Sequence, residues 1–327
     1  MQRNSNTKAI ALGSLACVFF SATYVLNSFL SAKGGHWAWT TGLRSFFLML
    51  LLVLLLSAQG QLKHLLWVMR QNLQVWLVWG GVAFGLSYYF LTFAASFGPG
   101  WLVAGAFQFT IVAGILLSPF LYKDHRAKIP VKALLLSLLI MAGIACMQWS
   151  QKNGSYSQQQ LWWCVGLVML AAFSWPLANR KLLLYVEESK HPLNAIQRVA
   201  GTALGSFPFQ LIMMGYGYSQ AGLPGQEQLL TVLLISLSSG VIGCILFFRA
   251  MHLARLDATS LAAVEATQSI EIVFTVIGEV LLLGIRWPNW IGNVGMLLVV
   301  FGLVLYSIPS RQKVLQIAEP DISPNQI

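Results

Sequence analysis

Residues 258–283 read ATSLAAVEATQSIEIVFTVIGEVLLL, a stretch long enough to cross a bilayer that nevertheless carries three glutamates. At about 100° per residue, its polar side chains fall within an arc of roughly 120°. These side chains are Glu265, Gln268, Glu271, Thr275 and Glu279. An ionised carboxylate in hydrocarbon costs about 2.5 kcal/mol or more even on lenient insertion scales. The sequence therefore predicts that this polar stripe faces the interior of a helix bundle or a wet cavity.

Apolar runs of similar length recur along the whole chain. Its 327 residues are 57% apolar and only 9% charged, with a mean hydropathy of +0.69, which is the composition of a membrane protein. The sequence predicts an all-α integral membrane protein with ten transmembrane helices. The expected spans are Ala9–Ala32, Trp37–Ala58, Val75–Phe97, Trp101–Tyr122, Val131–Gln148, Leu161–Tyr185, Leu193–Gly215, Leu229–His252, Ala258–Leu283 and Trp287–Ile308.

The basic residues are distributed unevenly between the two sides of these spans. Of the 20 Lys and Arg residues, Arg44 and Arg198 lie well inside spans, fifteen lie in loops or at span ends on the side of both termini, and three lie opposite. This bias predicts that both termini are cytoplasmic. The net charge of +10 therefore indicates membrane orientation and not a nucleic-acid partner, because no connecting segment is long enough to form a solvated basic surface.

Small repeated features divide the chain into two halves. Gly13 precedes Ser21 by eight residues, as Gly166 precedes Ser174, and Arg44 and Arg198 follow these serines after 23 and 24 residues. The expected units are residues 1–155 and 156–310, each with five spans, followed by a disordered cytoplasmic tail at 311–327. Because five is odd, the two units must be inverted relative to each other in the membrane. Such inverted repeats are typical of secondary transporters, whose sites lie where the halves meet.

The ten-span, five-plus-five pattern resembles the drug/metabolite transporter superfamily, as do the early arginines of the second and seventh spans and the pair Gly278-Glu279. Four further segments resemble its bacterial branch of multidrug resistance efflux transporters: residues 27–30 (NSFL), 34–39 (GGHWAW), 42–45 (GLRS) and 263–269 (AVEATQS). The resemblance implies a solute transporter in the bacterial cytoplasmic membrane. The first half departs from the pattern, since residues 118–121 read SPFL in place of a Gly-Glu pair.

Polar residues inside the spans are the candidate site. We expect Glu265, Glu271 and Gln268 to couple protons or bind substrate, because a carboxylate desolvated in a cavity can exchange a proton near neutral pH. Structural pairing of these carboxylates with an arginine is the alternative, and Glu279 fits a role in capping or helix packing. The remaining candidates for lining the cavity or pairing charges are Arg44, Arg198, Tyr89, Thr92, Gln108 and Glu279.

These features favour a secondary active exporter of small organic solutes, either drug-like cations or metabolites, which is coupled to protons and works by alternating access. An uncoupled facilitator of amino acids or related metabolites is the main alternative, and a membrane-embedded lipid-modifying enzyme or a non-transporting sensor are minor ones. The sequence contains no glycine-rich phosphate-binding loop that would indicate transport driven by ATP. The four cysteines show no metal-ligand spacing. We expect no cofactor, and the oligomeric state stays open.

Overall fold

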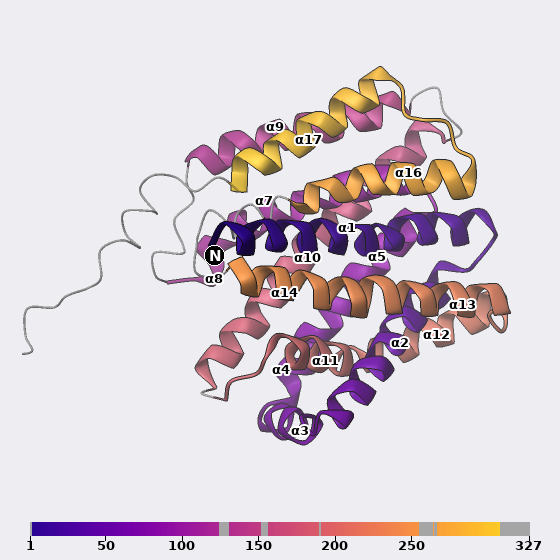
Figure 1. Cartoon of the computed structure of the whole chain (residues 1–327). Helices are drawn as coiled ribbons and strands as arrows, with labels where there is room; N and C mark the ends of the chain where they lie inside the picture. The colour runs from indigo at the N-terminus through magenta and orange to yellow at the C-terminus, as the bar shows by residue number, and fades with distance from the viewer. Residues whose placement is uncertain are drawn as a thin grey trace, which may run out of the picture.

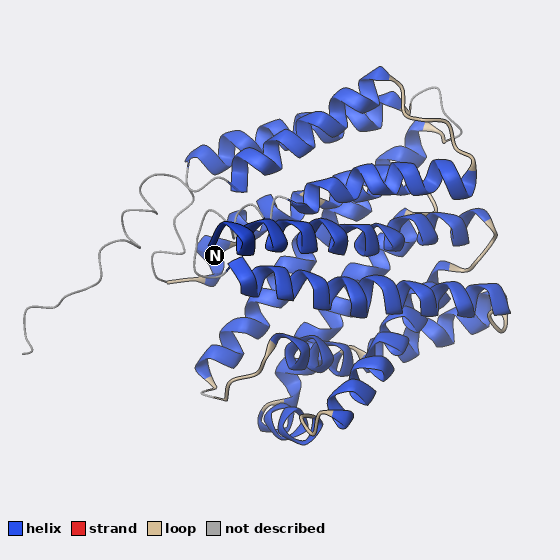
Figure 2. Ribbon diagram, in the orientation of Figure 1, coloured by secondary structure: helices blue, strands red, loops and turns tan. Residues whose placement is uncertain are grey.

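The computed structural model describes residues 2–123, 131–151, 156–189, 191–254, 264 and 267–307. Every regular element in these ranges is a helix (Figures 1 and 2). In chain order the helices are α1 (Gln2–Ala32), α2 (Trp37–Ala58), α3 (Leu62–Gln71), α4 (Leu73–Gly80), η1 (Gly81–Leu86), α5 (Ser87–Ala94), α6 (Gly100–Phe107), α7 (Phe109–Leu116), α8 (Ser118–Leu121), α9 (Val131–Ser150), α10 (Gln158–Glu188), α11 (Ala195–Gly205), α12 (Phe207–Ala221), α13 (Gln226–Ile235), η3 (Ser236–Gly243), α14 (Cys244–Ala254), η4 (Thr267–Ile270), α16 (Glu271–Leu283) and α17 (Trp290–Ser307).

Five helices in the described part are long and apolar enough to cross a membrane by length and composition: Thr7–Ala32, Trp37–Ala58, Leu73–Ala94, Gln158–Glu188 and Gln226–Met251. Shorter apolar helices lie at Gly100–Leu116, Leu135–Ser150 and Trp290–Leu305. The all-helical membrane class is therefore as the sequence predicts, whereas the number of ten spans stays a prediction.

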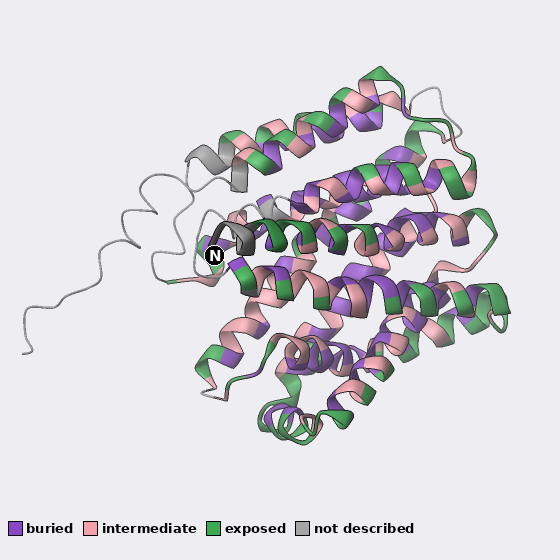
Figure 3. Ribbon diagram, in the orientation of Figure 1, coloured by how far each residue is buried: buried purple, intermediate pink, exposed green. Residues whose placement is uncertain are grey.

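Burial follows the pattern of a protein that faces lipid. Leu54 and Leu297 are each 67% exposed, while Ser45, Ser236 and Thr275 are fully buried. Figure 3 shows the exposed residues along the outer sides of the helices and the buried residues between them. Apolar side chains on the outside and small polar side chains between the helices are the arrangement expected in a lipid bilayer. There, small polar residues hydrogen-bond neighbouring helices to each other.

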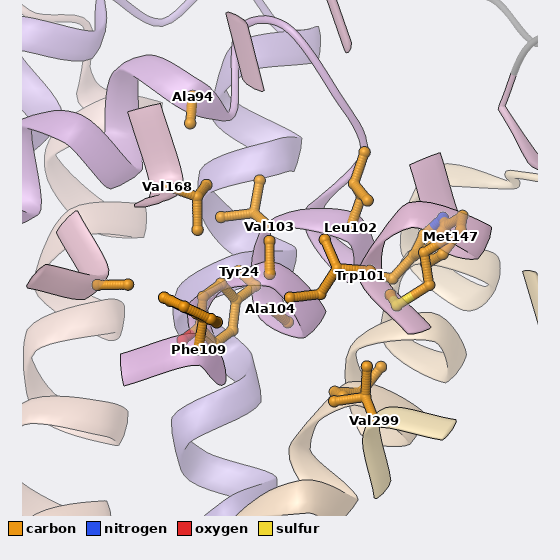
Figure 4. Close-up of a cluster of buried hydrophobic side chains, with 14 of the residues drawn as sticks. Tyr24, Ala94, Trp101, Leu102, Val103, Ala104, Phe109, Met147, Val168 and Val299 are labelled. Carbon is orange, nitrogen blue, oxygen red and sulfur yellow. The ribbon is translucent and has the colours of Figure 1, made fainter. Parts of the chain in front are cut away.

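The helices pack as pairs around two long central members. Helix α1 contacts η3, α14, α16 and α6, and α10 contacts η1, α5, α7 and α6. Helix α2 packs on α12, and α9 lies alongside α17 at one edge of the bundle (Figure 1). Glycines permit this last approach, since a Cβ on Gly143 would stand only 2.8 Å from the carbonyl oxygen of Gly295. The largest buried cluster includes Tyr24 of α1 and Trp101 of α6 (Figure 4).

Several local features differ from the sequence expectations. Helix α3 is a separate helix before the third span, and α12 runs on to Ala221, past the expected end at Gly215. The third and eighth expected spans each contain a π-helical segment, η1 and η3, which the apolar runs do not predict. In the ninth span, α16 begins at Glu271 after the short 3-10 helix η4, so the described part of this span is not one continuous α-helix.

Candidate functional site

A cavity of about 490 Å³ lies in the middle of the bundle. Residues from both halves of the chain form its wall, including Tyr24 of α1, Phe84 of η1, Trp175 of α10 and Gly240 of η3. Most of the lining is apolar and aromatic. Among the described residues, its charged groups are Arg44, Arg180, Arg198 and Glu271. This volume and this mixture of apolar walls with a few polar groups are typical of a site for a small organic molecule.

Glu271 lies where two interrupted helices meet. It is the first residue of α16 and only 8% exposed, and its position at a helix N-terminus favours a carboxylate there. Gln108, at the break between α6 and α7, donates from Nε2 to Glu271 Oε2 at 3.4 Å and to the backbone oxygen of Gln268 at 3.5 Å. The structure therefore brings together three of the residues that the sequence singles out, Gln108, Gln268 and Glu271, at one wall of the cavity.

Arg44 reaches the cavity from α2. Its guanidinium carbon lies 3.9 Å from the centre of the Tyr88 ring, within the range of a cation–π contact. The Tyr88 hydroxyl donates to Asn27 Oδ1 at 3.2 Å, which fixes the ring under the guanidinium. The Nε atom of Arg44 is buried and has no hydrogen-bond partner among the described residues. Arg44 is thus held in place by stacking and keeps donor capacity.

Two further arginines line the same cavity. Arg198 enters from α11, where its charge interacts with that of Glu187 on α10. Arg180 belongs to α10, although its place near the end of an expected span groups it with the loop cations. It donates to the backbone oxygen of Gly114, and to Ser118 Oγ at 2.7 Å, and so covers the end of α7. An arginine followed directly by Lys181 at a span end gives no sequence signal that separates a cavity residue from a loop cation.

Three candidates do not line the cavity. Glu279 is fully buried two turns beyond Glu271 and accepts the backbone N–H groups of Gly100 at 2.7 Å and Trp101 at 2.9 Å. It therefore caps the N-terminus of α6. Thr92 is bonded to Thr41, with 2.5 Å between their hydroxyl oxygens. Tyr89 packs against Trp37, and Glu265, the remaining candidate, lies outside the described residues.

Five rings form an aromatic layer beside the start of α2: His36, Trp37, Tyr89, Phe93 and Tyr216. The Trp37 ring is central, with centroids 5.2 Å from Tyr89, 4.8 Å from Phe93 and 5.6 Å from Tyr216. Burial lowers the pKa of His36, whose Nδ1 accepts the Ala38 N–H, so the neutral imidazole stacks on Trp37. This aromatic layer joins α2, α5 and α12 at the end of the bundle remote from the N-terminus.

Comparison with known proteins places the chain in a family. The family model described as "EmrE: Putative multidrug resistance efflux transporter" matches residues 7–312. The chain belongs to this family of efflux transporters. The match confirms the resemblance seen in the sequence, and together with the apolar helices it makes the protein a multi-pass membrane protein of a transporter family.

Relatives of this transporter cover most of its length. "Uncharacterized protein YjlA" of Bacillus subtilis (strain 168) is 40% identical over 315 residues, which are 94% of this chain and 96% of the relative. An "Uncharacterized 42.1 kDa protein in intracellular alkaline protease 3'region" of Shouchella clausii is 36% identical over 82% of this chain and 71% of its own. A solved structure described as "Crystal structure of protein" shares the fold, with a TM-score of 0.61 over 96% of this chain and 99% of its own at 14% identity.

Proposed function

We propose that this transporter is a secondary exporter of small organic solutes in the bacterial cytoplasmic membrane, and that Glu271 exchanges protons during an alternating-access cycle. The observation that carries the proposal is the position of Glu271, a nearly buried carboxylate on the wall of a cavity large enough for a metabolite. A carboxylate in this position is costly to keep charged when the cavity is empty. Glu271 therefore gains or loses a proton when solute enters or leaves the cavity and when the cavity opens to the other side of the membrane.

Helix packing supports an inverted repeat of five and five helices as the basis of alternating access. The contacts of α1 with η3, α14 and α16 are matched by those of α10 with η1, α5 and α7. The π-helical segments η1 and η3 fall in the third and eighth expected spans, and both contribute to the cavity wall. Single π-helical turns are frequent at functional sites, because they widen a helix locally without ending it.

The cavity and the aromatic layer support an inward-facing state. The cavity extends from Glu271 towards Arg198 near the start of α11, and towards Phe248 on α14. The aromatic layer and the Thr41–Thr92 contact close the opposite end. With both termini in the cytoplasm, as the distribution of basic residues predicts, solute would enter from the cytoplasm and leave once the aromatic layer separates.

The direction of proton coupling depends on the charge of the solute. A cationic solute would compete with the proton for Glu271 and give antiport, whereas an anionic solute would bind more tightly when Glu271 is protonated. One proton per solute across one pH unit corresponds to about a tenfold solute gradient. With the outside more acidic, antiport drives a cationic solute out, whereas an anion that moves together with a proton leaves only down its own larger outward gradient.

The test compares transport by the wild type with that by Glu271→Gln, which keeps the size and hydrogen bonding of the side chain but cannot titrate. Proteoliposomes that contain the protein are loaded with a bacterial metabolite extract, and solute release is measured by mass spectrometry with and without a pH gradient. We expect the gradient to alter release by the wild type and not by Glu271→Gln.

The matched control is Glu227→Gln, which changes an exposed carboxylate in the first turn of α13 and should retain the response to pH. Release by Glu271→Gln that responds to the gradient as fully as the wild type would replace proton coupling with the facilitator alternative. Absence of protein-dependent release of any solute would contradict transport itself.

A further inference from the structure

The charges around the cavity are unequal. Three guanidinium groups, from α2, α10 and α11, face it against the single carboxylate of Glu271 within the described residues. An arginine side chain stays protonated at all physiological pH values, whereas a carboxylate can be neutralised by one proton. Whatever the protonation state of Glu271, the described wall therefore carries net positive charge.

Arg44 is the arginine best placed to bind an anion. Its guanidinium lies over the Tyr88 ring on the cavity wall, and its buried Nε, a hydrogen-bond donor, lacks a partner among the described residues. A buried guanidinium gains most from a carboxylate or phosphate group, which can accept two parallel hydrogen bonds from it. Arg180, by contrast, already donates to Gly114 and Ser118, and Arg198 lies in the field of Glu187.

The rest of the wall suits an apolar body. Phe84 and Trp175 are stacked with ring centroids 5.4 Å apart, and Phe20 meets Phe247 edge-on at 5.9 Å. All four of these side chains line the cavity. Aromatic walls with a charged group at one place favour a ligand that has an aromatic or apolar body and a single polar head.

Resting on the proposed transport function, we propose that the solute is an organic anion with an aromatic or apolar body, whose acidic group binds Arg44. The anion and a proton on Glu271 then assist each other, because protonation removes the negative charge that would repel the ligand. Among the described residues, the other titratable groups on the cavity wall are the phenols of Tyr24 and Tyr88, the thiol of Cys244 and the three arginines, and the thiol of Cys17 lies close to Glu271. Thiols and phenols ordinarily titrate above pH 8, so a change in affinity between pH 6 and pH 8 that is lost in Glu271→Gln reports on Glu271.

The test uses three probes of matched shape, which are 2-naphthylacetate, 2-(2-naphthyl)ethanol and 2-(2-naphthyl)ethylammonium. Their affinities for the purified full-length protein are measured by calorimetry at pH 6 and pH 8. We expect the anion to bind at least tenfold more tightly than the alcohol, with higher affinity at pH 6, and the ammonium to bind most weakly. Equal affinities of the wild type for the three probes, or tightest binding of the ammonium, would overturn the proposal without the need for any variant.

Variants of Arg44 test whether this residue binds the acidic group of the ligand. Arg44→Gln should weaken the anion at least tenfold while leaving the affinity of the alcohol unchanged, and Arg44→Lys should restore part of the loss. Arg70→Gln, which changes an exposed arginine on α3, should have no effect. An anion that binds Arg44→Gln as tightly as the wild type would remove Arg44 from the proposal.

Transport of the same probes separates the two proposals. Binding of the anion without its release from proteoliposomes contradicts the transport function while supporting the charge of the ligand. Release of the ammonium in preference to the anion contradicts the charge while supporting transport.

Discussion

Glu271 and Glu279 lie two turns apart on the same face of α16, yet their different surroundings indicate different roles. Glu271 borders the cavity and has one side-chain donor among the described residues, Gln108, whereas Glu279 receives two backbone N–H groups from α6. The polar stripe in the sequence correctly predicts that both side chains are buried. It cannot tell them apart, because the difference comes from α6, a helix far away in the chain.

Glu279→Gln should lower the stability of the protein. The amide retains one acceptor oxygen, so one of the two N–H groups at the start of α6 loses its partner, at a cost of about 1–3 kcal/mol. Thermal unfolding in detergent should show a lower midpoint for Glu279→Gln and a nearly unchanged one for Glu271→Gln. Equal midpoints for Glu279→Gln and the wild type would contradict the capping role.

Among the elements, the start of α6 is defined by close backbone packing. Pro99 precedes Gly100 and has an extended backbone, which ends the preceding turn. A Cβ on Gly100 would stand 2.8 Å from the Tyr24 backbone oxygen and 2.9 Å from Glu279 Oε1. Gly100→Ala should therefore push α6 from α1 and α16 and cost roughly 1–3 kcal/mol.

Gly166→Ala in α10 is the matched control for that substitution. A Cβ at Gly166 meets no atom within 4 Å, and alanine is favoured over glycine inside a helix by up to about 1 kcal/mol. Urea or thermal unfolding should place Gly100→Ala below the wild type and Gly166→Ala at or above it. Similar shifts for the two variants would mean that packing at α6 is looser than the contacts indicate.

Long apolar runs in the sequence do not predict α3, η1 or η3, because none of these elements changes the hydropathy in a way that marks it as a separate helix. Helix α3 is short and amphipathic, with Leu65, Val68 and Met69 buried and Lys63 and Arg70 exposed, so its polarity hides it. The π-helical segments η1 and η3 add backbone width without any change in hydropathy. The apolar runs themselves predict most of the helix positions well, because length and hydropathy are what a bilayer selects.

At the scale of the molecule, the distribution of charge predicts the orientation in the membrane. We expect a fluorescent-protein fusion after Pro309 to report a cytoplasmic C-terminus, and an alkaline-phosphatase fusion after Lys152 to report an external loop. The opposite signals would reverse the orientation of the cavity and the direction of transport. The positions of lysine and arginine supply this prediction, but the cavity itself depends on which helices become neighbours, and for that reason only some of its residues could be named in advance.

The positive wall of the cavity has an electrical consequence. In the proposed cycle, a monovalent anion that crosses together with one proton on Glu271 moves no net charge, so the membrane voltage does no work on it. In Glu271→Gln the anion would cross alone, and an inside-negative potential would drive its exit by about 2.3 kcal/mol per 100 mV. Release of 2-naphthylacetate under a potassium–valinomycin potential should thus be insensitive to voltage in the wild type and accelerated in Glu271→Gln. The loss of one carboxylate would then convert electroneutral transport into electrogenic transport.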